Sequence, residues 1–86
     1  MAQSSIKRFI KKISVAHAHT VYIDGVYQVK VAKLGVRAFS ITNGDETYTL
    51  DSSCISRVTV DDNDAGSYAF FYKNGAVLTL KLTENN

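Results

Sequence analysis

Three dipeptides, Asp24-Gly25, Asn43-Gly44 and Asn74-Gly75, constrain the fold of this chain. Each stands between two stretches in which apolar and polar residues alternate, the pattern of a half-buried β-strand. A type I′ turn requires positive φ at both central positions, and Asn-Gly and Asp-Gly meet that requirement at low cost. Each dipeptide therefore predicts a two-residue β-hairpin, and with it which side chains share a face of the sheet.

The rest of the chain after residue 16 has the alternation and turn chemistry of antiparallel strands. Gly35 predicts a bulge or a sharp bend, since a glycine inside a strand pattern favours either. The 61–66 stretch is a loop by its Asp, Asn and Gly content. We expect a sheet over 17–82 and a tail at 83–86, with strands at 18–23, 26–33, 36–42, 47–50, 55–60, 67–72 and 76–82.

The N-terminal segment has the period of an amphipathic helix rather than a strand. Four large apolar residues fall at i, i+3, i+4 and i+7, and four cations occupy the other side. These are Ile6, Phe9, Ile10 and Ile13, opposed by Lys7, Arg8, Lys11 and Lys12. A helix over about 5–14 follows, capped by Ser4 or Ser5. A helix this short is marginal alone, so it must dock on the sheet, on a partner or on a membrane surface.

Length and composition favour one mainly β (α+β) domain over 1–86. Eighty-six residues, 45% of them hydrophobic, leave no room for a second core. The single cysteine, Cys54, cannot form an internal disulfide, and no apolar run is long enough to span a bilayer. Residues 1–16 superficially resemble a mitochondrial presequence, but only Arg8 supplies arginine. We expect a cytoplasmic protein with no membrane span.

A helix followed by a meander suggests a small, strongly bent antiparallel sheet, in the form of a partly open barrel of SH3-like or Sm-like shape. Sm-like proteins share the order of a helix followed by bent strands. The chain has none of their sequence signatures, so this fold analogy implies no function.

The strand at 67–72 carries the first candidate site. If Asn74-Gly75 forms a two-residue turn, Phe71 faces Leu78 in the core and the opposite face presents an aromatic stripe. The stripe consists of Tyr68, Phe70 and Tyr72, with Lys81 beside it. Aromatic residues at this spacing stack nucleic-acid bases or anchor protein interfaces. The alternative is that the stripe receives the N-terminal helix, because a large exposed apolar patch is unusual on a monomer.

Charge is divided unevenly along the chain. Residues 1–42 contain seven cations and one carboxylate, whereas residues 43–86 contain three cations and seven carboxylates. Six of the cations of the first part are candidates for contacting phosphates, unless the face they form is simply solvated. The phosphate-binding candidates are Lys7, Arg8, Lys11, Lys12, Lys30 and Lys33.

Signals for catalysis or for a metal site are weak. His17 and His19 share one strand face, but a structural zinc site needs four ligands and a catalytic site three. The Asp-rich 61–66 loop fails the EF-hand template, because Ala65 stands at the third ligand position. Cys54 has no nucleophile signature around it, so a small buried thiol is expected. We expect no enzyme, no metal and no cofactor.

These observations predict a small non-enzymatic binding module with an accessory or regulatory role. The leading hypothesis is protein–protein association, including formation of a homo-oligomer, through the aromatic stripe or an unpaired sheet edge. The alternative is a nucleic-acid-binding protein, in which the cations of the first half contact phosphates and the aromatic stripe stacks on bases.

Overall fold

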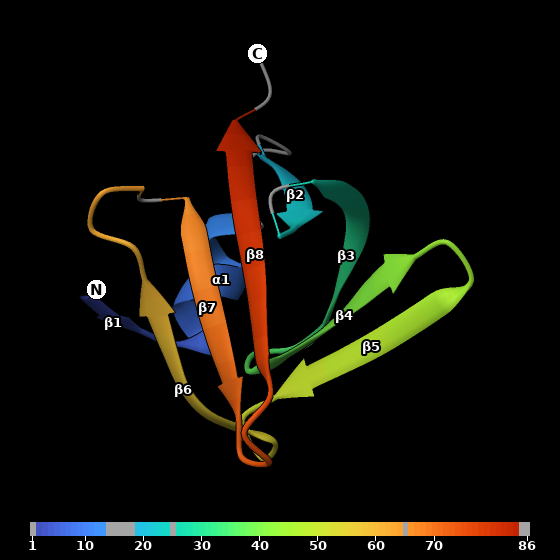
Figure 1. Ribbon diagram of the computed structural model, residues 1–86. Helices are drawn as coiled ribbons and strands as arrows, with labels where there is room; N and C mark the ends of the chain where they lie inside the picture. Colours follow the sequence, from blue (N-terminus) through green and yellow to red (C-terminus); the bar gives the residue numbers. More distant parts are fainter. Residues whose placement is uncertain (1, 14–18, 25, 65, 85–86) are drawn as a thin grey trace.

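The protein is a mostly antiparallel β structure with one short helix near its N-terminus (Figure 1). The structure is a computed structural model that describes residues 2–13, 19–24, 26–64 and 66–84. The strands and the N-terminal helix confirm the predicted mainly β (α+β) fold class. The described elements are β1 (Ala2–Ser4), α1 (Ile6–Ile13), β2 (His19–Ile23), β3 (Tyr27–Gly35), β4 (Ala38–Asn43), β5 (Glu46–Asp51), β6 (Ile55–Val60), β7 (Ser67–Tyr72) and β8 (Val77–Glu84).

The strands form one open sheet in the order β1-β6-β7-β8-β2-β3-β4-β5, so β1 and β5 are its two edges. The sheet bends at β3, which pairs with β2 through Tyr27–Val29 and with β4 through Lys30–Gly35. The predicted irregularity at Gly35 is confirmed, because the β3–β4 register shifts between Lys33 and Gly35. Strand β1, which no sequence pattern indicated, pairs with β6.

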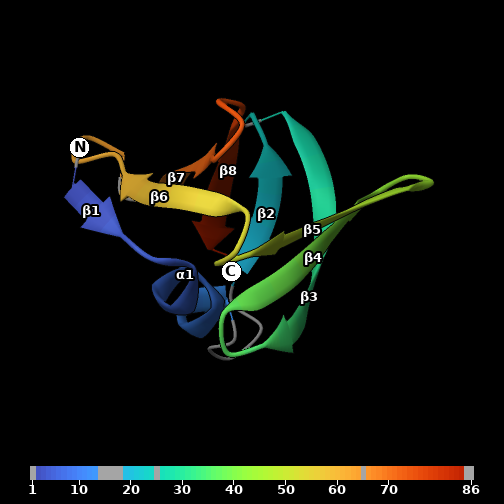
Figure 2. The same ribbon diagram turned by 90° about the horizontal axis from the view of Figure 1, so that it is seen from below.

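Helix α1 lies on the inner side of the bent sheet (Figure 2). Ser5 caps it by accepting a hydrogen bond from the Arg8 backbone N–H at 3.2 Å. The Phe9 ring is fully buried and lies 4.9 Å from the Phe39 ring, measured between centroids. The same ring lies 5.2 Å from Tyr68 and 5.1 Å from Phe70. One side chain of the helix therefore joins both limbs of the sheet.

The register of the β7–β8 hairpin is not the predicted one. The Tyr72 main-chain carbonyl accepts a hydrogen bond from the Gly75 N–H, and the Tyr72 N–H donates one to the Ala76 carbonyl. Residues 73–75 therefore form a three-residue loop. Gly75 adopts φ of +94°, as expected for a type I turn followed by a bulge glycine. Phe70 pairs with Leu78 and Phe71 with Val77. The prediction that Phe71 faces the core and Phe70 faces away is therefore wrong.

Lengthening a hairpin loop from two residues to three exchanges the faces on which the side chains of one strand lie relative to the other, because side chains alternate with a period of two. The three-residue loop places Tyr68, Phe70 and their partners Leu80 and Leu78 on the inner face. The two-residue turn would have paired the leucines with Phe71 and the small Ala69 instead. Burial of apolar area favours the register that collects the larger side chains on one face.

The β2–β3 hairpin deviates in the same way. Ile23 pairs with Tyr27 and Val21 with Val29, which leaves three residues between the strands rather than two. Val21 and Val29 are both buried, whereas the predicted two-residue turn at Asp24-Gly25 would put them on opposite faces. Asp24 has a φ of +53°, so the positive φ predicted for the dipeptide is present at this position.

The β4–β5 hairpin keeps its predicted faces although its turn lies one residue further along the chain. Asn43 pairs with Glu46, so Gly44 and Asp45 form the two-residue loop. Phe39 pairs with Leu50, whereas a loop formed by Asn43-Gly44 would pair it with Tyr48. The register of β5 therefore differs from the predicted one by two residues. An even change leaves the faces unaltered, so Phe39, Ile41, Tyr48 and Leu50 share one face. Phe39, Ile41 and Leu50 are fully buried, whereas Tyr48, which the same face would place in the core, is 44% exposed.

Gly66 lies where the loop after β6 touches β8. A Cβ atom at Gly66 would collide with the Leu82 carbonyl oxygen. The Gly66 carbonyl also accepts a hydrogen bond from the Leu82 N–H at 2.8 Å.

We expect Gly66→Ala to lower the free energy of unfolding by about 1–3 kcal/mol, measured by urea denaturation, because two main-chain segments must move apart. The control is Gly35→Ala, whose Cβ meets open space and whose effect should stay within about 1 kcal/mol. Equal effects would contradict this account.

Phe9 is the side chain of α1 with the most aromatic neighbours, so its truncation tests the docking of the helix. We expect Phe9→Ala to lower the free energy of unfolding by about 3–5 kcal/mol, and Phe9→Leu to lower it by less. The exposed Lys11 lies on the same helix, and Lys11→Ala should change stability by about 0.5 kcal/mol or less. A Phe9→Ala variant as stable as Lys11→Ala would show that α1 does not hold the sheet.

Candidate functional site

The aromatic stripe predicted on β7 is divided by the fold. Tyr68 and Phe70 are buried beneath α1, where Phe9 contacts both rings edge to face. The prediction that these two rings lie on an open sheet face is wrong, and the alternative, that the helix covers them, is confirmed. Tyr72 lies beyond the part of β7 that α1 covers and remains half-buried.

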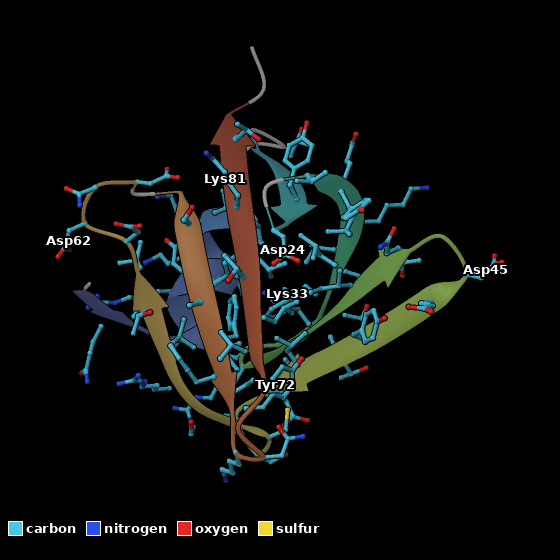
Figure 3. The ribbon with its side chains drawn as sticks, viewed as in Figure 1. Asp24, Lys33, Asp45, Asp62, Tyr72 and Lys81 are labelled. Carbon is cyan, nitrogen blue, oxygen red and sulfur yellow. The ribbon has the colours of Figure 1, made fainter. Side chains whose placement is uncertain are left out.

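Tyr72 lies in a cleft at the end of the inner face that the helix leaves free (Figure 3). The cleft has a volume of about 720 Å³, within the range of small-ligand and peptide-anchor pockets. Its rim carries exposed apolar side chains: Tyr27 is 61% exposed, Tyr48 44% and Val77 54%. We call it the tyrosine cleft. The described residues that line it are Ile23, Asp24, Tyr27, Asn43, Thr47, Tyr48, Thr49, Tyr72, Asn74, Ala76, Val77 and Leu78.

Strands distant in sequence build the tyrosine cleft because the sheet bends. Tyr72 and Leu78 come from the two sides of the β7–β8 turn, Tyr27 from the start of β3, and Tyr48 from the edge strand β5. The Asn74 Oδ1 accepts a hydrogen bond from the Ala76 N–H at 3.0 Å, which fixes the turn at the edge of the cleft. The cleft is therefore framed by structured hairpins.

The polar groups of the cleft include a carboxylate but no cation among the described lining residues. The Tyr48 hydroxyl donates a hydrogen bond to the Glu46 carboxylate, and this hydrogen bond and the carboxylate charge raise the pKa of Tyr48 above its ordinary value of 10.0. Burial raises the pKa of Tyr72 in the same direction. Both phenols are protonated at neutral pH and act as neutral hydrogen-bonding and apolar groups.

The predicted cationic residues lie away from this cleft. Lys7, Arg8, Lys11 and Lys12 are all exposed on α1, and Lys30 and Lys33 are exposed on β3. Lys81 pairs with Asp64, with Nζ 3.1 Å from Oδ2. Its cross-strand partners are Ser67 and Tyr22, which places it on the face opposite Tyr68. The structure therefore does not bring Lys81 together with the aromatic stripe.

The described part of the chain forms no metal cluster around the weak candidates, and the Cys54 thiol has a main-chain partner. His17 lies outside the described residues, and His19 belongs to β2, where it pairs with Glu84. The described residues contain no group of three or more His, Cys, Asp or Glu side chains placed to hold a metal ion. Cys54 is half-buried, and its thiol donates to the Asp51 carbonyl at 3.4 Å.

Comparison with known proteins gives no match: no family model, no curated protein and no solved structure matches this chain. Within the described residues, none of the helices has the length and apolar character needed to cross a membrane.

The sequence-based predictions give no site role to Tyr27, Tyr48 or Val77. Their convergence depends on the three-residue loops of two hairpins, which put Tyr27 and Tyr72 on the inner face. A signal was available in the sequence. Of the two loop lengths that each dipeptide permits, only one collects the large apolar residues of both strands on a single face.

The Tyr48–Glu46 contact gives a pH-dependent prediction. Glu46→Gln removes the negative charge beside the phenol, so the pKa of Tyr48 should fall toward 10.0. Titration of the Tyr48 ring carbon by NMR measures this pKa directly. Asp45→Asn removes a carboxylate at the hairpin tip and serves as the control (Figure 3). A pKa of Tyr48 that falls no further in Glu46→Gln than in the control would contradict the assignment.

Proposed function

We propose that this protein is a non-enzymatic binding domain that captures an extended segment of a partner protein. The segment pairs with the edge strand β5 and places apolar side chains in the tyrosine cleft. The observation that carries this proposal is the cleft's exposed rim of Tyr27, Tyr48 and Val77. Tyrosine is enriched among the residues that dominate binding at protein interfaces.

The edge strand supports an extended ligand. Strand β5 pairs only with β4 among the described strands, so its other edge has no strand partner. Glu46, Thr47, Tyr48 and Thr49 of this strand are exposed, and three of them line the cleft. The β4–β5 hairpin projects from the rest of the sheet in both views (Figures 1 and 2). Strand addition supplies main-chain hydrogen bonds, and a pocket beside the edge supplies side-chain specificity.

The charge of the cleft supports a neutral or basic segment. Asp24 lines the cleft, Glu46 stands beside Tyr48, and the described lining includes no lysine or arginine. This charge also disfavours nucleic acid at this site, because phosphates need cations near the stacking rings. The free thiol of Cys54 fits a domain that acts in the reducing cytoplasm.

Alanine substitution in the cleft tests the proposal. Peptides selected from a random display library on the wild-type protein should carry apolar anchor residues and bind in the cleft. We expect Tyr27→Ala and Tyr48→Ala each to weaken their binding by about 30-fold, the effect of an interface anchor. Isothermal titration calorimetry measures the change.

Tyr22→Ala is the matched control. Tyr22 lies on the neighbouring strand β2, and its partners Gln28 and Lys81 place it on the face opposite the cleft. Its substitution should leave peptide binding nearly unchanged. A failure to select any binding peptide, or equal losses in all three variants, would refute the proposed site. Light scattering over a wide concentration range distinguishes a foreign segment from a second copy of this chain.

Nucleic-acid binding is the second candidate function, favoured by the exposed cations of α1. Its signature would be an affinity that falls steeply with salt, in proportion to the number of phosphates neutralised. Filter binding with single-stranded and duplex probes at two salt concentrations measures this. A flat response to salt would eliminate it.

A further inference from the structure

A second depression lies where the open sheet fails to close, between the start of α1 and strand β6. Strand β1 pairs with β6 only at Val58–Val60, so Ile55–Arg57 has no described strand on that side. The β3–β4 turn and the β5–β6 loop approach the gap from the other limb and leave an open volume of about 380 Å³. We call this depression the seam pocket. Its polar lining includes Ser5, Lys7, Arg37, Ser52 and Arg57.

Three cations from three separate segments line the seam pocket. Lys7 comes from α1, Arg37 from the turn between β3 and β4, and Arg57 from β6. The described lining includes no carboxylate, and none of the three cations forms an ion pair with a described carboxylate. Asp51 is next to Ser52 in the chain, but its Oδ1 accepts hydrogen bonds from the Ser53 and Cys54 N–H groups. No described carboxylate therefore lines the pocket or forms an ion pair with its three cations.

Local contacts prepare these groups to bind an anion. Arg57 pairs with Phe71 across the β6–β7 ladder, and its guanidinium lies over the Phe71 ring on the outer side of the open edge, with Cζ 4.2 Å from the centroid. Stacking holds the guanidinium plane and leaves its in-plane N–H groups able to donate to a ligand at this edge. Ser5 uses its oxygen to accept the Arg8 N–H, so its hydroxyl proton can be donated to a ligand. The hydroxyl of Ser52 makes no hydrogen bond to a described residue. The N-terminus of α1 adds partial positive charge on the same side.

We infer that the seam pocket binds a phosphate dianion, either free or as the terminal group of a phosphomonoester. Three cations that line one depression from both sides of the open edge suit a compact group with two charges, and guanidinium groups match the oxygens of phosphate in geometry. A polyanionic strand would instead need cations spread at intervals along a track. This inference is independent of the tyrosine cleft, whose lining shares no residue with the seam pocket.

The test is a titration of the full chain with inorganic phosphate, followed by amide NMR at constant ionic strength and mildly alkaline pH. We expect saturable shifts at the amides of Ser52 and Arg57. Arg37→Gln and Arg57→Gln should each weaken binding by at least about tenfold, the usual effect of losing a hydrogen bond to a charged group. Arg37 has no cation–π contact with a described ring, so its variant tests the site even if Arg57→Gln disturbs the sheet.

Lys30→Gln is the charge-matched control, because Lys30 is an exposed cation on β3 that does not line the pocket. It should change phosphate affinity by no more than about twofold. Shifts that grow without saturation, or equal weakening in the control, would show general charge screening and overturn the inference.

A second arm separates the sources of phosphate. A nucleoside monophosphate should shift the same amides as inorganic phosphate and compete with it. An oligonucleotide without terminal phosphates carries only singly charged diesters and should bind this pocket more weakly. If it binds the same amides more tightly, the ligand is a nucleic-acid strand and the dianion assignment is wrong.

Discussion

The insertion of Phe9 between the two limbs of the bent sheet is the interaction on which the rest of the structure depends. Its ring contacts Phe39 on one limb and Tyr68 and Phe70 on the other, with centroid distances of 4.9–5.2 Å. Aromatic pairs in tilted and edge-to-face geometry bury large areas and add directional attraction. Without this ring, the inner face of an open sheet would expose its largest apolar side chains to water. The helix thus completes a core that the strands alone leave open.

Both candidate binding sites follow from what one short helix can cover. Helix α1 contains eight residues, so it covers the part of the inner face around Phe70 and leaves the part around Tyr72 as the tyrosine cleft. At the start of α1 the sheet does not close, and cations from three segments meet in the seam pocket. The two sites differ in chemistry, since one is aromatic with carboxylates nearby and the other is cationic. Different ligands are therefore expected at each.

Much of the fold could be predicted from local patterns. The helical period of Ile6, Phe9, Ile10 and Ile13 located α1, and alternation with Gly-containing turns located the seven strands from β2 to β8. The three residues of β1 are too few to show a pattern. The candidate sites were less accessible, because Tyr27, Tyr48 and Tyr72 lie far apart in the sequence and converge only through the bend at β3. Arg37 and Arg57 likewise gave no signal, since nothing in their spacing places them together.

The sequence alone determined where the chain turns, because Gly in these dipeptides marks sites of positive φ. It also determined which residues alternate along each strand. Only the tertiary structure decided whether a loop contains two residues or three, and that choice exchanges the faces of a hairpin. Both loop lengths suit the same dipeptide locally, so local energies do not separate them. The larger apolar area buried beneath α1 favours the three-residue loop of the β7–β8 hairpin, and this choice turned Phe70 inward and Phe71 outward.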